Sequence, residues 1–553
     1  MEHVWFKHYQ EGVAHSIDTS IYNSIPEILE DSFSKFPNNP AFHCMGKTLT
    51  YSEIDLQSRK FASYLQNDLN LSKGDRVAIM MPNILQYPIA LFGALRAGMV
   101  AVNVNPLYTG RELEHQLNDS GAKTIVIFEN SAHVLESVIS NTGVENVLTT
   151  KIGDMLDFPK SMIVNFVIKN IKKMVPAWNI NGTKDFLECV KSGDETKFIR
   201  PDISREDTAF LQYTGGTTGV SKGAELIHNN IIANLMQAKA WISPVTEDGK
   251  EIIITPLPLY HIFSLTANCF TFSTVGALNV LITNPRDMKG FVKELNKWKF
   301  TAITGVNTLF NGLLNSPGFA DVDFSSLKLT LGGGMAVQKA VADKWENVTG
   351  VPLIEAYGLT ETSPAACINP LDLKSYNGAI GLPVSSTEVV IKDDDGKTLP
   401  VGEIGEICIK GPQVMKGYWN RPEETKNVMT DDGFFKSGDI GVMNEEGFFK
   451  IVDRKKDMIL VSGFNVYPNE IEDVICSNEK VFECAAVGAP DEKSGEVVKL
   501  FVVKKDESLT VDELKKFCKE NLTGYKVPKI YEFRDELPKS NVGKILRKDL
   551  RDS

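Results

Sequence analysis

The sequence YTGGTTGVSKG occupies residues 213–223, at the end of the apolar run TAFLQY, which predicts a β-strand. It holds four glycines, four hydroxyl side chains and one lysine. Glycine permits a tight turn and brings backbone N–H groups close to an oxygen, while the hydroxyls and the lysine add donors and positive charge. This composition predicts a polyphosphate-binding loop made of Tyr213, Thr214, Gly215, Gly216, Thr217, Thr218, Gly219, Ser221 and Lys222.

Two familiar loop patterns fit this stretch less well. The Walker pattern requires a glycine directly before the lysine, whereas Ser221 precedes Lys222, so a kinase-like P-loop is not indicated. Residues 219–223 match G-x-S-x-G, the nucleophile elbow of esterases, and His228 or His261 lies downstream to complete a triad. An elbow serine needs a sharp strand-to-helix turn, but a loop-like run separates the strand from this serine. A serine esterase is therefore the weaker alternative.

Composition and charge narrow the class of protein. The chain has 553 residues, enough for two to four domains and a buried small-molecule site. Its net charge of −12 argues against general nucleic-acid binding, because no excess of Lys and Arg is available to displace phosphate counterions. The eight cysteines form no C-x-x-C pair, which predicts free thiols in a reducing compartment. The N-terminus lacks the apolar core of a secretory signal, so we expect a cytoplasmic protein.

One long segment, from Ile252 to Pro285, contains no Asp, Glu, Lys or Arg. It is long enough to span a membrane, but prolines and polar residues interrupt it and leave no 18-residue apolar run. We interpret it as buried sheet and helix around an apolar cavity. A membrane-bound carrier is the alternative interpretation.

Helix and strand patterns alternate over residues 24–129 and again after the glycine-rich loop. Continuous apolar strands between helices predict parallel sheets covered on both faces. We therefore expect an α/β protein with a large N-terminal domain, residues 1–452, of two parallel-type α/β layers plus a small β-rich subdomain at about 377–452. The charge cluster at 453–457 predicts a linker, and residues 458–553 predict a small α+β C-terminal domain.

Residues 161–175, SMIVNFVIKNIKKMV, have the pattern of a basic amphipathic helix. The apolar face would carry Val164, Val167, Ile168, Ile171 and Val175. The polar face would carry Asn165, Lys169, Lys172 and Lys173. Such a helix can lie on an anionic membrane surface, although most pack on their own domain, so both interpretations stay open.

A second glycine run belongs to a predicted βαβ unit. A strand at 327–331 ends in three glycines at 332–334, a helix follows, and VPLIEAYG at 351–358 predicts the next strand. Such a unit brings the ends of two parallel strands together, where ligands bind in open α/β sheets. A planar base can lie over the glycine backbone and against Tyr357. Glu361 stands between two threonines beside the predicted phosphate site, an arrangement that suits Mg²⁺.

These separated motifs together resemble those of acyl-CoA synthetases of the adenylate-forming family, in particular bacterial long-chain fatty-acid CoA ligases. Besides the glycine-rich loop they are PLYHIF at 258–263, YGLTETSP at 357–364, SGD at 437–439, DRKKD at 453–457 and PKSNVGK at 538–544. The resemblance covers essentially the whole chain. Residues 432–456 are similar to the family's fatty-acyl signature. They depart from it where Phe434, Lys436 and Ser437 stand for the more usual Trp, His and Thr, which bears on fine substrate preference.

The resemblance implies a role for each matching residue. The glycine-rich loop would hold the β- and γ-phosphates of ATP, and Thr214 and Glu361 would hold the metal. The nucleotide would further contact Gly332, Gly333, Gly334, Ala356, Tyr357, Gly358, Thr360, Asp439, Ile451 and Arg454. The catalytic residues would be Thr214, Lys222, His261, Glu361 and Lys544, with His261 at the acyl carboxylate and Lys456 as the hinge.

The resemblance also implies the reaction. The fatty-acid carboxylate would attack the α-phosphorus of ATP to give acyl-adenylate and pyrophosphate, and the thiol of coenzyme A would then displace AMP. The C-terminal domain would rotate about Lys456 between these half-reactions and withdraw Lys544. We thus expect ATP, Mg²⁺, coenzyme A and a long-chain fatty acid as partners, with a homodimer also implied. An adenylation enzyme that loads a carrier protein shares the nucleotide motifs and is a further alternative.

Overall fold

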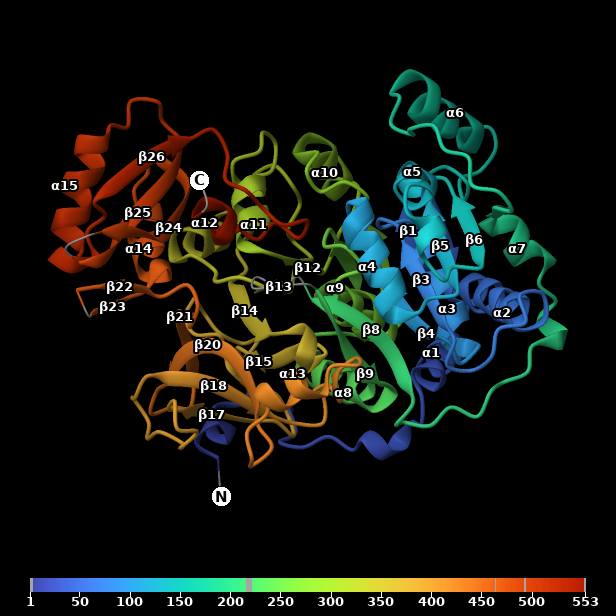
Figure 1. Ribbon diagram of the computed structural model, residues 1–553, viewed down its shortest axis with the longest axis horizontal. Coiled ribbons are helices and arrows are strands. Elements are labelled where there is room, and N and C mark those ends of the chain that lie inside the picture. The colour runs from blue at the N-terminus through green and yellow to red at the C-terminus, as the bar shows by residue number, and fades with distance from the viewer. Residues whose placement is uncertain (1–2, 215–220, 463, 492–493, 552–553) are drawn as a thin grey trace.

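The computed structural model describes residues 3–214, 221–462, 464–491 and 494–551. Figure 1 shows a large N-terminal part with two sheet layers and surrounding helices, a strand-rich unit at the lower left, and a C-terminal unit in red at the upper left. The predicted α/β class, with a β-rich unit and a smaller α+β C-terminal unit, is confirmed. Residues 215–219, which carry most of the predicted phosphate loop, lie outside the described residues.

One sheet contains the strand that leads into the glycine-rich loop. Its strand order in the described residues is β19-β9-β8-β4-β3-β5-β6-β7, and all pairs from β8 to β7 are parallel. The strands β3, β4 and β5 are buried almost throughout, as expected for strands covered by helices on both faces. The bounds are β3 (Arg76–Met80), β4 (Val100–Asn103), β5 (Thr124–Phe128), β6 (Asn146–Thr150), β7 (Lys184–Asp185), β8 (Thr208–Thr214), β9 (Lys222–Ile227) and β19 (Gly417–Tyr418).

The strands β8 and β9 flank the glycine-rich loop as antiparallel neighbours, with Thr214 paired with Lys222. Ser221 therefore directly precedes a strand, whereas a nucleophile elbow turns from a strand into a helix. This arrangement contradicts the serine esterase alternative.

A second sheet has the order β16-β15-β14-β13-β12-β10-β11-β1-β2 and is parallel from β14 to β1. Gly332 pairs with Glu355 and Gly333 with Ala356, so two of the three predicted turn glycines belong to a strand. The bounds are β1 (Pro40–Cys44), β2 (Lys47–Thr50), β10 (Ile252–Thr255), β11 (Leu278–Leu281), β12 (Ala302–Gly305), β13 (Leu329–Gly333), β14 (Leu353–Gly358), β15 (Ala365–Ile368) and β16 (Leu382–Pro383).

Local sequence sets the ends of several helices around these sheets. In α4 (Gly110–Ser120), Thr109 and Glu112 form a capping box, and Gly121 ends the helix with a φ of 62°. The other helices are α1 (Ile25–Lys35), α2 (Tyr51–Asn67), α3 (Gln86–Arg96), α5 (Ala132–Glu136), α7 (Phe186–Ser192), α8 (His228–Ile242), α9 (Ile262–Ser264) with a π-helical continuation (Leu265–Thr271), α10 (Met288–Leu295), α11 (Asn307–Leu314) and α12 (Lys339–Thr349).

The strand-rich unit and the C-terminal unit meet directly after β21. The strand-rich unit contains an antiparallel sheet with the order β17-β18-β20-β21. The bounds are β17 (Glu388–Lys392), β18 (Gly405–Lys410), β20 (Phe435–Met443) and β21 (Phe449–Arg454). Helix α13 (Pro422–Asn427) lies between β18 and β20 in the sequence. The C-terminal unit contains β22 (Ile459–Val461), β23 (Phe464–Val466), α14 (Pro468–Cys476), β24 (Val481–Asp491), β25 (Gly495–Lys504), α15 (Val511–Asn521), β26 (Ile530–Arg534) and α16 (Arg547–Arg551).

Helix α6 (Lys160–Phe166) and its π-helical continuation (Val167–Ile171) project from the upper right of the molecule in Figure 1. Asn165, expected on the outer face, instead donates to Asp154 at 2.9 Å and accepts from the Gly153 amide at 2.8 Å. The prediction is therefore wrong for Asn165, which faces the protein. Val164, Val167 and Ile168 are half-buried and Lys169, Lys172 and Lys173 are exposed, as predicted. Large apolar side chains point to solvent, namely Phe158, Met162, Ile163, Phe166, Ile171 and Met174.

No helix in the described part of the chain combines the length and the apolar character that crossing a bilayer requires. The uncharged segment 252–285 instead supplies β10, α9 and β11, whose residues are mostly buried.

Candidate active site

A cavity lies at the carboxyl ends of β13 and β14 and encloses about 930 Å³, counting its open mouth. Its polar end is lined by side chains and backbone from segments far apart in sequence: His261, Gly334, Tyr357, Thr360 and Lys544. The structure thus brings together the second glycine run, the YGLTE segment and the lysine near the end of the chain. Ala356 and Gly358 line the same cavity.

The remainder of the cavity is apolar and follows β13. Leu329, Leu331 and Gly333 all line it, as expected for alternate residues on one face of a strand. At ~3.3 Å per residue these three positions span roughly 13 Å. Helix α8 contributes Ala238 and Trp241, and the uncharged segment contributes Ile262, Phe263, Thr266, Ala267, Thr271 and Phe272. The interpretation of that segment as a cavity wall is therefore confirmed.

Tyr357, Asp439 and Arg454 form a connected group beside the polar end. The Tyr357 hydroxyl donates to Asp439 Oδ2 at 2.7 Å, and Arg454 Nε lies 3.1 Å from Asp439 Oδ1. Asp439 and Arg454 are paired neighbours on β20 and β21, so the sheet register fixes their separation. Burial and the adjacent carboxylate raise the pKa of Tyr357, which keeps its hydroxyl protonated as a donor.

Lys544 projects into the cavity from the loop between β26 and α16. Ser540 holds this loop, since its hydroxyl accepts from the Lys544 amide at 3.1 Å and its amide donates to the Lys544 carbonyl at 2.7 Å. Gly334 has a φ of 76°, and a Cβ there would lie 3.3 Å from Lys544 Cε. Burial of the ammonium, followed by repulsion from Arg454, lowers the pKa of Lys544 to about 8.

His261 caps α9, and its Nδ1 accepts from the Phe263 amide at 3.3 Å. Burial, with the nearby Lys544 charge second, lowers the pKa of His261 to about 3. The ring is therefore neutral at physiological pH. Since Nδ1 accepts a hydrogen bond, the proton of the neutral ring lies on Nε2, which makes that atom a donor.

Lys222 and Glu361 both contact Tyr418, which lies on β19. The Lys222 ammonium contacts Glu424 and lies 4.8 Å from the centre of the Tyr418 ring. The Tyr418 hydroxyl donates to Glu361 Oε1 at 2.7 Å, and Glu361 is 8% exposed. The two predicted phosphate and metal residues therefore share one aromatic neighbour.

The remaining predicted residues have varied surroundings. The Tyr213 hydroxyl donates to Asp119 of α4 at 2.7 Å, so this side chain supports the sheet, and its role in nucleotide binding stays a prediction. The Thr214 carbonyl accepts from the Ser221 hydroxyl at 2.5 Å. Ile451 lies half-buried on β21, and Lys456 is the second residue after the end of that strand. For Gly215, Gly216, Thr217, Thr218 and Gly219, which lie outside the described residues, the roles stay predictions.

Sequence reasoning missed Tyr418 and Glu424. The available signal was the segment GYWNRPEET at 417–425, in which two aromatic residues follow a glycine and two carboxylates precede a threonine. That pattern alone does not indicate a partner. Only the pairing of β19 with β9 brings it to Lys222.

Comparison with known families settles the class of this fold. The AMP-binding enzyme family matches residues 29–419, and the AMP-binding enzyme C-terminal domain matches residues 470–544. The chain belongs to the AMP-binding enzyme family. Its adenylate-forming character agrees with the convergence of the separated motifs on one cavity.

Individual relatives of this AMP-binding enzyme extend along its full length. A long-chain-fatty-acid–CoA ligase from Yersinia pestis is 57% identical over 552 residues, covering 100% of this chain and 98% of the relative. The crystal structure of ATP-bound MatB from Rhodopseudomonas palustris is 28% identical with a TM-score of 0.82, covering 96% of this chain and 99% of that one. A Mycobacterium tuberculosis fatty acyl CoA synthetase is 26% identical with a TM-score of 0.71, covering 97% and 99%.

Proposed function

We propose that this AMP-binding enzyme is a long-chain fatty-acid CoA ligase, which joins a long-chain fatty acid to coenzyme A with cleavage of ATP to AMP and pyrophosphate. The observation that carries the proposal is a single cavity with a lysine-bearing polar end and an apolar remainder, whose wall follows roughly 13 Å of β13. The full-length similarity to ligases of that name supports the choice of acid.

In this proposal the polar end holds the nucleotide. Adenine would lie between Tyr357 and the glycines of β13, and Asp439 and Arg454 would bind the ribose hydroxyls, since a carboxylate accepts from two O–H groups and a guanidinium donates. Thr360 would donate to the α-phosphate. The loop from Thr214 to Lys222 would hold the β- and γ-phosphates, which requires Lys222 to exchange its contact with Glu424 for phosphate oxygens.

Glu361 suits the Mg²⁺ that accompanies ATP, with Thr214 beside it, because Mg²⁺ takes few carboxylates and fills its shell with phosphate oxygens and water. When bound, this ion would neutralise charge on the phosphate oxygens. Tyr418 would orient the Glu361 carboxylate through its hydrogen bond of 2.7 Å.

Two half-reactions follow from these assignments. A fatty-acid carboxylate oxygen forms a bond to the α-phosphorus, the bond from that phosphorus to the bridging oxygen breaks, and pyrophosphate leaves. Lys544 offsets the charge that builds up on the α-phosphoryl oxygens, and neutral His261 donates to the second carboxylate oxygen and orients it. The sulfur of coenzyme A then forms a bond to the acyl carbon, the bond to the AMP oxygen breaks, and the thiol proton passes to solvent.

We place the boundary between the large N-terminal domain, residues 1–452, and the C-terminal domain, residues 458–553, at the segment 453–457. The C-terminal domain would rotate about Lys456 after the first step, withdrawing Lys544 and opening a path for the thiol. The support is that Lys544 reaches the cavity from one unit while the other cavity residues come from the N-terminal part. Such a movement would also limit water access to the adenylate.

The test is ATP–pyrophosphate exchange across fatty acids of graded length. We expect exchange to depend on the acid and to increase with chain length until the apolar part of the cavity is filled. Addition of coenzyme A should then yield acyl-CoA. If the adenylate instead passes only to a carrier protein and free coenzyme A gives no thioester, the carrier-loading alternative holds.

We propose in addition that the enzyme is cytoplasmic and contacts the inner face of the plasma membrane through segment 158–174. Six large apolar side chains there are more than half exposed, with fractions from 53% to 79%. The segment holds four lysines and no acidic residue in a chain of net charge −12, which suits an anionic lipid surface. Flotation with phosphatidylglycerol vesicles should be lost in an Ile163→Ser/Phe166→Ser variant whose ligase activity in detergent is unchanged.

The implied homodimer is a further part of the proposal, measurable by light scattering.

A further inference from the structure

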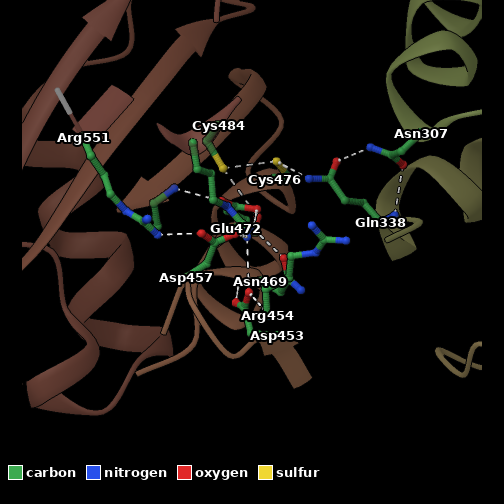
Figure 2. Close-up of polar contacts among 12 residues, drawn as sticks. Asn307, Gln338, Asp453, Arg454, Asp457, Asn469, Glu472, Cys476, Cys484 and Arg551 are labelled. Atoms are coloured by element: carbon green, nitrogen blue, oxygen red, sulfur yellow. Dashed lines mark hydrogen bonds and ion pairs between the residues drawn. The ribbon is translucent and has the colours of Figure 1, made fainter. Parts of the chain in front are cut away.

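A buried cluster of charged side chains joins the C-terminal unit to the strand that precedes it (Figure 2). At its centre lies the Arg547 guanidinium, which contacts Asp453 Oδ1 at 3.2 Å, Asp457 Oδ2 at 3.5 Å and Glu472 Oε2 at 2.6 Å. The same guanidinium donates to Asn469 Oδ1 at 2.5 Å. Arg547 follows Lys544 by three positions in sequence.

The two partners Asp453 and Arg547 belong to different units. Asp453 lies on β21 and pairs with Ile440 of β20, so its position is fixed by the strand-rich sheet. Arg547 begins α16 and is held to α14 by Glu472, which accepts from Arg547 Nε at 3.0 Å and from Nη2 at 2.6 Å. The contact of Asp453 with Arg547 therefore crosses the segment that contains Lys456.

The Asp453 carboxylate has no exposed surface. Apart from the Arg454 amide of its own strand, which donates to Oδ1 at 2.6 Å, its partners belong to the C-terminal unit. Besides Arg547 it accepts from the backbone amide of Asn469 at 2.8 Å, in the first turn of α14. Burial raises the pKa of Asp453 to about 6, and the Arg547 charge opposes that rise. Separating a buried carboxylate from its guanidinium leaves an uncompensated charge, which is strongly unfavourable.

We propose that Asp453 and Arg547 form a latch that holds Lys544 at the polar end of the cavity. A rotation of the C-terminal unit about Lys456 would move Arg547 away from Asp453, so this ion pair favours the arrangement in which Lys544 lines the cavity. The two residues are positioning residues for adenylate formation, since neither lines the cavity. The inference rests on the proposed function, because it assumes two separable half-reactions.

A second contact, between the N-terminal part and the C-terminal unit, provides a matched control. Gln338, at the start of α12, donates through Nε2 to Cys476 Sγ at 3.0 Å and accepts from Asn307 Nδ2 at 3.1 Å (Figure 2). A sulfur acceptor makes only a weak hydrogen bond, and these groups carry no net charge. Loss of this contact should therefore shift the arrangement of the units much less than loss of the ion pair.

The experiment compares Asp453→Asn, Arg547→Lys and Gln338→Ala with the native enzyme in two assays, ATP–pyrophosphate exchange with palmitate and transfer of palmitate from synthetic palmitoyl-adenylate to coenzyme A. Asp453→Asn keeps the size and the acceptor oxygen but removes the charge. We expect it to lower exchange about tenfold and to leave transfer within about twofold of the native rate, because only the first step needs the latched arrangement. Arg547→Lys keeps the charge but loses the forked geometry, so its loss should be smaller. Gln338→Ala should lie close to native in both assays.

Thermal unfolding separates these effects from misfolding. If the unfolding midpoint of Asp453→Asn falls strongly, the latch is tested with Arg547→Lys instead. Equal losses in exchange and transfer by a well-folded variant, or native exchange in both latch variants, would overturn the latch. Failure of the native enzyme to catalyse any palmitate-dependent exchange would instead overturn the proposed function.

Discussion

At its polar end the cavity collects His261, Tyr357, Thr360 and Lys544 from separate segments, one of which belongs to the C-terminal unit. At its apolar end, by contrast, the walls are β13, helix α8 and the uncharged segment, all within the N-terminal part. Under the proposed function, binding of an acyl chain would therefore need only the N-terminal part. Activation of the carboxylate would depend on the position of the C-terminal unit.

The largest effect is expected from removing the lysine that the C-terminal unit contributes. Lys544→Ala should lower ATP–pyrophosphate exchange about 10²–10³-fold, because the charge on the α-phosphoryl oxygens loses its counter-charge. Transfer from synthetic acyl-adenylate to coenzyme A should change less than about threefold, because the proposed rotation withdraws Lys544 from the cavity before this second step. Equal losses in the two assays would contradict the division between the ends of the cavity.

A substitution at the apolar end should change the preference for acyl-chain length and leave ATP binding unaffected. Ala238 lines the cavity from α8, so Ala238→Phe should shorten the space available to the acyl chain. We expect kcat/KM for palmitate to fall about tenfold relative to that for octanoate, with the KM for ATP unchanged, because overfilling an apolar wall discriminates by size. A loss shared equally by both acids would show that Ala238 lies outside the acyl site.

The rate of ATP–pyrophosphate exchange should depend on pH through the polar end of the cavity. The pKa of Lys544 is lowered to about 8, so its charged form is lost as pH rises through that value. Exchange measured as kcat/KM for ATP should therefore decrease above about pH 8, because this parameter reports ionisation of the free enzyme. Lys544→Arg keeps its charge at all these pH values, so whatever activity it retains should lack this decrease. The same decrease in both enzymes would assign it to another group.

The smallest effect is expected from Glu355, a buried carboxyl on β14 beside the cavity strands. Burial raises the pKa of Glu355 to about 8, although its carboxylate accepts from the Val337 amide at 3.2 Å. Since the folded-state pKa is raised, its contribution to stability is present at low pH and is lost as pH rises toward about 8. The melting temperature of Glu355→Gln, relative to that of the native enzyme, should therefore rise by ~3 °C as the pH increases from about 5 to about 8. A constant difference across this range would contradict the assignment.

The sequence predicted different parts of this molecule with unequal success, and the reasons are physical. Alternating helices and apolar strands predicted the two sheet layers, because the apolar residues of each strand indicate by themselves that it is buried. The uncharged segment likewise predicted an apolar wall. The contact of Lys222 and Glu361 with Tyr418 was not predicted, because it depends on the pairing of β19 with β9 across a long separation in sequence.

Helix α6 shows the complementary failure. Its helical periodicity was read correctly, but Asn165 bonds to Asp154 and the Gly153 amide and so faces the protein. These two hydrogen bonds hold the polar side chain against the protein, and periodicity cannot reveal such partners. The same limit applies to Asp453 and Arg547, which in sequence are charged residues like many others.

The most direct measurement of the central claim is the identity of the products from ATP, palmitate, coenzyme A and Mg²⁺. The account predicts palmitoyl-CoA, AMP and pyrophosphate in equal amounts, with no ATP cleavage when palmitate is left out. Formation of ADP and orthophosphate, or of no thioester at all, would contradict it.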